Sequence, residues 1–152
     1  MFKSIQWKII AIFLLLTVSV MILVGTFLLQ NITAYYHNDF TSSLDKQFFT
    51  DEVMAEFENV IDSPEGVDKA LSLLKVYSVR MGIDSFRNYY ILDSSLNVLG
   101  GSSEKTDTFE PTSNLTLAMS GERGNIVEKD SRIMDYAISV GASGHIIYIT
   151  DT

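Results

Sequence analysis

Cysteine is absent from the 152 residues, and only two histidines, His37 and His145, are present. The absence of cysteine excludes disulfides, thiolate metal sites, iron–sulfur clusters and a cysteine nucleophile. Positive charge is also scarce, since 11 basic residues stand against 19 acidic ones and the formal net charge is −8. Phosphate binding needs a cationic surface, so this balance argues against nucleic acid as a partner.

Motifs of the common enzyme classes are missing as well. The chain contains no GxxxxGK[ST], no GxGxxG, no HExxH and no EF-hand loop. The segment Gly141–His145 lacks the final glycine of a GxSxG elbow, and three Ser-x-x-Lys matches stand without their companion motifs. We therefore predict no catalytic residue, no metal site and no cofactor in this chain.

One long apolar run lies near the N-terminus. Ile9 to Leu29 are 21 consecutive residues without a charge, which as a helix span roughly 30 Å, the thickness of a bilayer core. A cleavable secretory signal is the alternative, but the run is too long for one and no small-residue cleavage pattern follows it. Lys3 and Lys8 precede the run, so the positive-inside bias places residues 1–8 in the cytoplasm, a membrane span at 9–30 and residues 31–152 outside.

The remainder forms an acidic domain, with nine basic and 19 acidic residues after Lys3 and Lys8 are set aside. Residues 31–62 contain neither proline nor glycine, so we expect the anchor helix to continue outward as an amphipathic stalk. Its apolar positions recur every three to four residues, at Tyr36, Phe40, Leu44, Phe48, Phe49, Val53, Phe57 and Val60. Ser63 as N-cap and Pro64 at the first position then predict a second helix, which Gly82 ends.

Beyond Gly82 the pattern changes to the alternation of strands. Two hairpins are predicted, Arg87–Leu92 with Val98–Leu99 and Met134–Val140 with His145–Thr150. A short helix capped by Thr112 or Ser113 and closed by Gly121 lies between them, followed by a candidate strand at Asn125–Glu128. The fold class is thus α+β, with a transmembrane helix, a stalk helix and an antiparallel sheet of about five strands with flanking helices.

Four side chains are candidates for ligand binding. Arg87 could hold a carboxylate, Asp135 could hold an amine, and Tyr89 or Tyr136 could supply a hydroxyl or a stacking face. The competing interpretation is structural, because Arg87 and Asp135 lie near strand ends and many alternating aromatics simply fill a core.

The order of elements resembles the extracytoplasmic sensor region of bacterial membrane sensor histidine kinases, of the PAS-like Cache (PDC) type. The segments that carry the resemblance are the anchor with its stalk, RNYYILD at 87–93, NVLGGS at 97–102, DYAISV at 135–140 and GHIIYIT at 144–150. The resemblance implies a PAS-like fold and a homodimeric two-component receptor in the bacterial cytoplasmic membrane. A second transmembrane helix and a cytoplasmic kinase would then follow Thr152.

In that family the extracytoplasmic region passes a signal to the transmembrane helix. The resemblance therefore implies a small-molecule or protein signal for this chain, whose identity the sequence does not indicate. Two alternatives stay open from the sequence. One is a membrane-tethered domain that binds only a protein partner, and the other is the same sensor module on a chemoreceptor or a cyclase.

Overall fold

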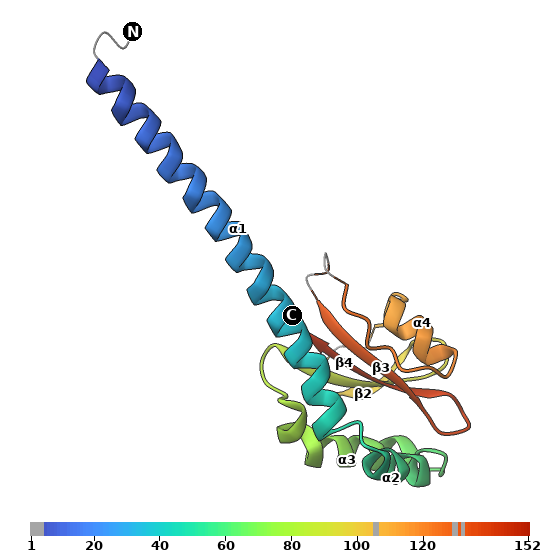
Figure 1. The fold of residues 1–152 in the computed structure, drawn as a ribbon. Coiled ribbons are helices and arrows are strands. Elements are labelled where there is room, and N and C mark those ends of the chain that lie inside the picture. The colour runs from blue at the N-terminus through green and yellow to red at the C-terminus, as the bar shows by residue number, and fades with distance from the viewer. Residues whose placement is uncertain (1–4, 105–106, 129–130, 132) are drawn as a thin grey trace. The chain divides into compact units, whose positions relative to one another are not determined.

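A computed structural model describes residues 5–104, 107–128, 131 and 133–152. These residues form two compact units, divided between Tyr36 and His37. Helix α1, Ile5–Gln47, begins in the first unit and ends in the second (Figure 1).

The first unit is helical and almost wholly apolar. Its part of α1 is long and apolar enough to cross a membrane, and no residue of its most apolar stretch is buried. Four of its polar side chains, Thr17, Thr26, Asn31 and Thr33, donate to the carbonyl oxygen four residues earlier, at 2.8 to 3.0 Å. Such internal hydrogen bonds satisfy these groups without water.

The second unit contains the end of α1, three further helices and four strands. The helices are α2 (Asp51–Ile61), α3 (Gly66–Met81) and α4 (Ser113–Met119), and the strands are β1 (Arg87–Leu92), β2 (Val98–Gly101), β3 (Met134–Val140) and β4 (His145–Asp151). All pairings are antiparallel, in the order β2-β1-β4-β3. The α+β class predicted from the sequence is confirmed.

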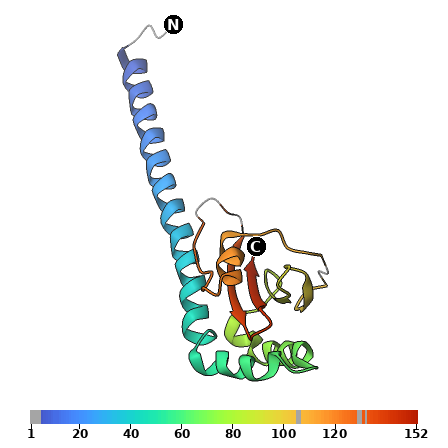
Figure 2. The same cartoon turned by 90° about the vertical axis from the view of Figure 1, so that its right-hand side faces the viewer.

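Helices cover both faces of this sheet. The end of α1, α2 and α3 pack on one face, where Phe48, Phe49, Phe57, Leu74 and Tyr136 form the larger core. The short helix α4 covers the other face through Leu115 and Ala118 (Figures 1 and 2). Successive side chains of a strand point to opposite faces, so each strand supplies both cores.

The predicted stalk helix is interrupted, which corrects the single helix expected over 31–62. Helix α1 ends at Gln47, and Thr50 caps a separate helix α2 by accepting a hydrogen bond from the Val53 amide. Phe48 and Phe49 are both buried although they are adjacent, and adjacent residues of one straight helix point about 100° apart. The break at 48–50 allows both rings to enter the core.

The start of the next helix also differs from the prediction. Helix α3 begins at Gly66, and Ser63 and Pro64 belong to the turn before it rather than to its cap and first position. A side chain on Gly66 would lie 2.0 Å from the Ile61 carbonyl oxygen, so the tight turn requires glycine there. Gly82 ends the helix in the left-handed conformation, as predicted.

The expected fifth strand is wrong for the described residues, which form a four-stranded sheet. Asn125–Glu128 has no strand structure, and its neighbour Gly124 makes one isolated antiparallel bridge to Ala137 of β3. A β-carbon on Gly124 would lie 2.1 Å from the Asn114 carbonyl oxygen, so the chain at this point is pressed against α4. That contact replaces further pairing along the edge of β3.

Candidate ligand pocket

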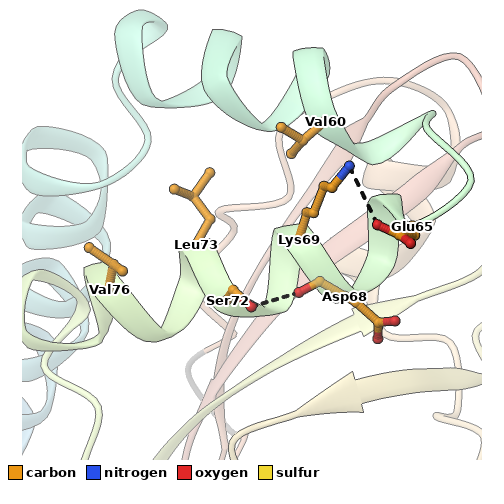
Figure 3. A pocket seen from close by; sticks show the side chains of 7 residues that line it. All are labelled: Val60, Glu65, Asp68, Lys69, Ser72, Leu73 and Val76. Carbon is orange, nitrogen blue, oxygen red and sulfur yellow. Dashed lines mark hydrogen bonds and ion pairs between the residues drawn. The ribbon is translucent and has the colours of Figure 1, made fainter.

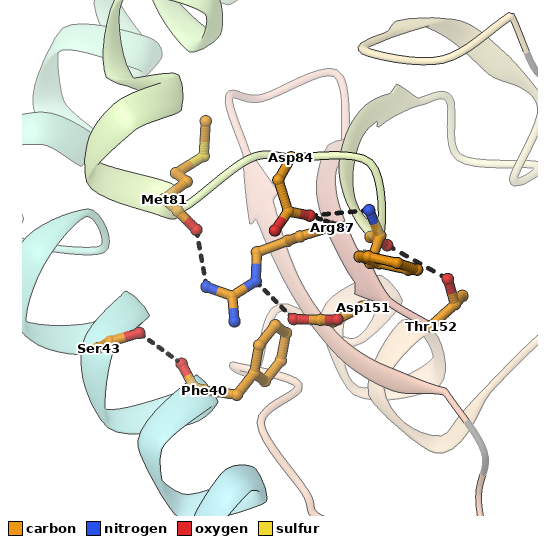
Figure 4. A network of polar contacts seen from close by, with 8 residues as sticks. Phe40, Ser43, Met81, Asp84, Arg87, Asp151 and Thr152 are labelled. Atoms are coloured by element: carbon orange, nitrogen blue, oxygen red, sulfur yellow. Dashed lines mark hydrogen bonds and ion pairs between the residues drawn. The ribbon is translucent and has the colours of Figure 1, made fainter.

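Arg87 is bound by groups of the protein itself. Its Nε donates to Oδ2 of Asp151 at 2.7 Å, and Nη1 donates to the Met81 carbonyl at 2.9 Å (Figure 4). The guanidinium carbon lies 4.9 Å from the centre of the Phe40 ring. Arg87 therefore ties the end of β4 to α3 and to α1, and its carboxylate partner is Asp151.

Tyr89 and Tyr136 belong to the same core as Phe40. Tyr136 is fully buried and stacks on Phe49 with ring centres 4.3 Å apart, and its hydroxyl donates to Asp45 of α1. Tyr89 is also buried in this core. Their rings pack between the sheet and the helices, which is the space-filling role weighed as the alternative for such aromatics.

Asp135 lies on the opposite face of the sheet. It precedes Tyr136 in β3, and consecutive strand residues face opposite sides. The structure thus separates Asp135 from the other three candidates by the thickness of the sheet, and the four do not share one site.

A pocket of about 450 Å³ opens beside Asp135 on the α4 side of the sheet. Small-molecule sites commonly enclose about 300 to 1,000 Å³, so this volume suits a small ligand. Strand residues and the segments on either side of α4 line the pocket, namely Asn88, Tyr90, Thr108, Phe109, Glu110, Thr112, Glu128, Ser131, Ile133, Asp135, Tyr148, Thr150 and Thr152.

Neutral donors hold the Asp135 carboxylate. Oδ2 accepts from the Thr112 hydroxyl at 2.6 Å and from the Tyr148 hydroxyl at 3.1 Å, while Oδ1 accepts from the Asn114 side-chain amide at 2.7 Å. Asn114 is 1% exposed, and its own oxygen accepts from the Ile126 amide at 2.7 Å. The network fixes the position of the carboxylate at the pocket wall.

Tyr148 stays protonated in this setting. Burial is the main cause that raises the pKa of its hydroxyl above the usual value, and the neighbouring Asp135 charge adds to it. A neutral hydroxyl keeps its proton to donate. Tyr148 therefore remains a hydrogen-bond donor to Asp135 throughout the physiological pH range.

Three aromatic rings form an apolar part of the pocket wall. The Phe109 ring lies edge-on between two tyrosines, with centres 5.0 Å from Tyr90 and 4.9 Å from Tyr148. The Tyr90 hydroxyl is 2.7 Å from the Ser103 hydroxyl. The rings thus stand as a connected group next to the carboxylate.

The described lining of the pocket is acidic and partly aromatic. Its described lining contains three carboxylates, Glu110, Glu128 and Asp135, and no lysine, arginine or histidine. Within the part of the chain that the structure describes, no three histidine, aspartate or glutamate side chains are grouped to hold a metal ion. What remains is an acidic recess with hydroxyl groups and aromatic rings.

A second pocket of similar volume, about 450 Å³, lies between α2 and α3 (Figure 3). Lys69 and Ser72 are engaged within α3 and the turn before it, because Lys69 pairs with Glu65 at 3.7 Å and Ser72 donates to the Asp68 carbonyl at 2.9 Å. Val60, Leu73 and Val76 supply its apolar wall. This surface groove offers no converging polar groups, so the pocket at Asp135 is the better candidate.

Sequence reasoning found Asp135 but missed its partners. Thr112 is one of the two helix caps that the sequence offers, and its hydroxyl both accepts from the Leu115 amide at 3.1 Å and donates to Asp135. Tyr90 and Tyr148 lie on the pocket face by simple alternation, which a known strand register would have indicated. No local signal points to Asn114 or Phe109, because their roles depend on how α4 and its preceding loop fold over the sheet.

Scanned against protein-family models the chain matches none, and a search of curated proteins finds no match.

Proposed function

We propose that residues 31–152, of which 37–152 form the compact unit, are the extracytoplasmic signal-sensing domain of a membrane receptor, PAS-like of the Cache type, in a sensor histidine kinase. The observation that carries the proposal is the placement of two neighbours in β3. Asp135 lines the pocket, and Tyr136 packs under the same strand against Phe49 and donates to Asp45 of α1. A single strand therefore joins a candidate binding site to the helix that also contains the apolar segment.

Signalling would use this strand. A ligand that moves the Asp135 carboxylate shifts the backbone of β3, and Tyr136 passes the shift to α1 through its hydrogen bond and its stacked ring. Small helix shifts of this kind are a known class of switch. The ligand can bias the equilibrium only by the difference between its affinities for the two arrangements.

The resemblance in element order supports the assignment to sensor kinases, and it leads us to propose a homodimer in the bacterial cytoplasmic membrane. The N-terminus would lie in the cytoplasm and the sensor outside, in keeping with Lys3 and Lys8 before the apolar run. A chemoreceptor or cyclase would use the same sensing step with another output.

The orientation in the membrane can be tested with single cysteines, since the chain has none of its own. Ser85 is exposed. We expect Ser85→Cys to react with a membrane-impermeant maleimide in intact spheroplasts, and Ser4→Cys to react only after the membrane is permeabilised. The reverse pattern would contradict the proposed orientation.

The coupling between β3 and α1 is tested by disulfide formation between copies of the chain. Single cysteines are placed in turn at positions 31 to 36, and the position that crosslinks fastest is recorded in membranes. Because Tyr136→Phe removes the donor to Asp45, we expect it to change which position crosslinks fastest. The matched control Tyr77→Phe removes a hydroxyl that donates to Glu56 between α3 and α2, outside the pocket, and should leave the pattern unchanged.

Two results would count against the receptor. Identical patterns in Tyr136→Phe and the unmodified chain would favour a tethered binding domain, whose helix only anchors it. Absence of crosslinking at all six positions would contradict the proposed dimer.

A further inference from the structure

We propose that the pocket at Asp135 binds a small organic cation, a quaternary ammonium or an alkylamine. This inference rests on the proposed function in one respect, that the pocket is where the signal binds. Its ligand class is argued from charge and lining alone.

The charge of Asp135 has no counter-ion among the described lining residues. Its three side-chain partners, Thr112, Asn114 and Tyr148, are all neutral donors. They orient the carboxylate, but they leave its negative charge in a partly buried place. Such a charge is stabilised by the nearby positive charge of either cation. A protonated alkylamine can in addition donate a charge-assisted hydrogen bond, whereas a quaternary ammonium, which has no N–H, is held by charge attraction alone.

The other charged groups of the described lining have the same sign. Glu110 and Glu128 are both exposed carboxylates at the pocket rim. Glu128 accepts a hydrogen bond from the Ser113 hydroxyl, which is again a neutral partner. An anionic ligand would be repelled by these three carboxylates of the described lining, whereas a cation is attracted by all three.

The aromatic rings distinguish an organic cation from a bare metal ion. Phe109, Tyr90 and Tyr148 line the same pocket as the carboxylates. A cation within about 6 Å of a ring centre is attracted to the ring face, and quaternary ammonium groups are commonly recognised in this way. Divalent metal ions instead need six to eight oxygen ligands or a fixed octahedral set, which an aromatic wall does not provide.

Binding is tested on the full chain in detergent micelles, with ligands paired by shape. Choline is compared with its neutral isostere 3,3-dimethylbutan-1-ol, putrescine with butane-1,4-diol, and succinate serves as the anion. A ligand that binds only the folded state raises the melting temperature. We expect choline or putrescine to raise it, and the two neutral alcohols and succinate to leave it unchanged.

The site is then located by measuring how single substitutions change the dissociation constant of the cation that binds. Asp135→Asn keeps the shape and removes the charge, and should weaken binding about tenfold or more. The matched control Asp39→Asn removes the same charge from an exposed position on α1 and should not change it. Phe109→Leu, which leaves the Asp135 network intact, should weaken binding about fivefold and keeps the test valid if Asp135→Asn unfolds.

The outcomes separate this inference from the proposed function. The proposed cation class would be overturned if a neutral alcohol raised the melting temperature as much as its matched cation, or if succinate raised it more. It would also be overturned if neither choline nor putrescine raised the melting temperature. The sensor proposal would still stand if Tyr136→Phe changed the α1 crosslinking. Cation binding that depends on Asp135, together with unchanged crosslinking in Tyr136→Phe, would retain the ligand class and overturn the sensor.

Discussion

Phe48→Ala is expected to destabilise the unit from His37 to Thr152 by about 3 to 5 kcal/mol, the usual cost of removing a buried phenylalanine ring. Phe48 is 0% exposed. Its ring centre lies 4.7 Å from that of Phe49 and 5.8 Å from those of Phe57 and Tyr77. It thus joins the end of α1 to α2 and α3, and its loss leaves a cavity at their junction.

Urea unfolding followed by the near-ultraviolet circular dichroism of the tyrosines measures this loss. Val79→Ala is the control, because Val79 is 88% exposed and its truncation should change the free energy of unfolding by no more than about 0.5 kcal/mol. A Phe48→Ala variant as stable as Val79→Ala would mean that the three helices do not pack as described.

Arg87→Met is expected to lower the free energy of unfolding by about 2 to 3 kcal/mol. Removing one partner of a fully buried ion pair costs about 3 to 5 kcal/mol. The Arg87 and Asp151 side chains are 19% and 18% exposed, so water partly screens the charge left on Asp151 and the cost is lower. The variant also loses the hydrogen bond to the Met81 carbonyl and the contact with the Phe40 ring.

The chain contains a matched exposed pair for comparison. Lys69 and Glu65 are 55% and 77% exposed and 3.7 Å apart, so Lys69→Met should cost no more than about 0.5 kcal/mol. Adding Asp151→Leu to Arg87→Met should restore part of the lost stability, since it removes the unpaired carboxylate. Strict additivity of the two changes would show that the pair contributes nothing as a pair.

Local patterns were sufficient for most of the secondary structure. Alternation predicted β1 and β3 with their observed bounds, and β4 to within one residue at its end. The sequence predicted the end of α3 at Gly82 and the start of α4 at Thr112 or Ser113, of which Thr112 is the cap, because capping depends on a few adjacent atoms. Thr50, followed by the acidic Asp51 and Glu52, is a comparable local signal for the start of a helix. The regular apolar spacing on both sides of it nevertheless favoured one long helix.

The candidate site depended on tertiary structure, which the sequence did not predict. Whether Arg87 and Asp135 share a pocket depends on which helices cover which face of each strand, and in the structure the two residues lie on opposite faces of the sheet. β1 and β4 are far apart in the chain, and their register brings Tyr90 opposite Tyr148. Asp151, the partner of Arg87, lies 64 residues away from it, so no local pattern could have assigned that arginine to an ion pair.

The strand order also determines when the domain can fold during translation. β4 follows the other three described strands in the chain, and it pairs with both β1 and β3. Until His145–Asp151 leaves the ribosome, β1 is paired only with β2, and an isolated two-stranded hairpin is marginally stable. The nascent chain therefore presents the unpaired edge of Tyr89–Leu92 from the time β1 emerges until β4 emerges, and chaperones that shield strand edges should matter most in that interval.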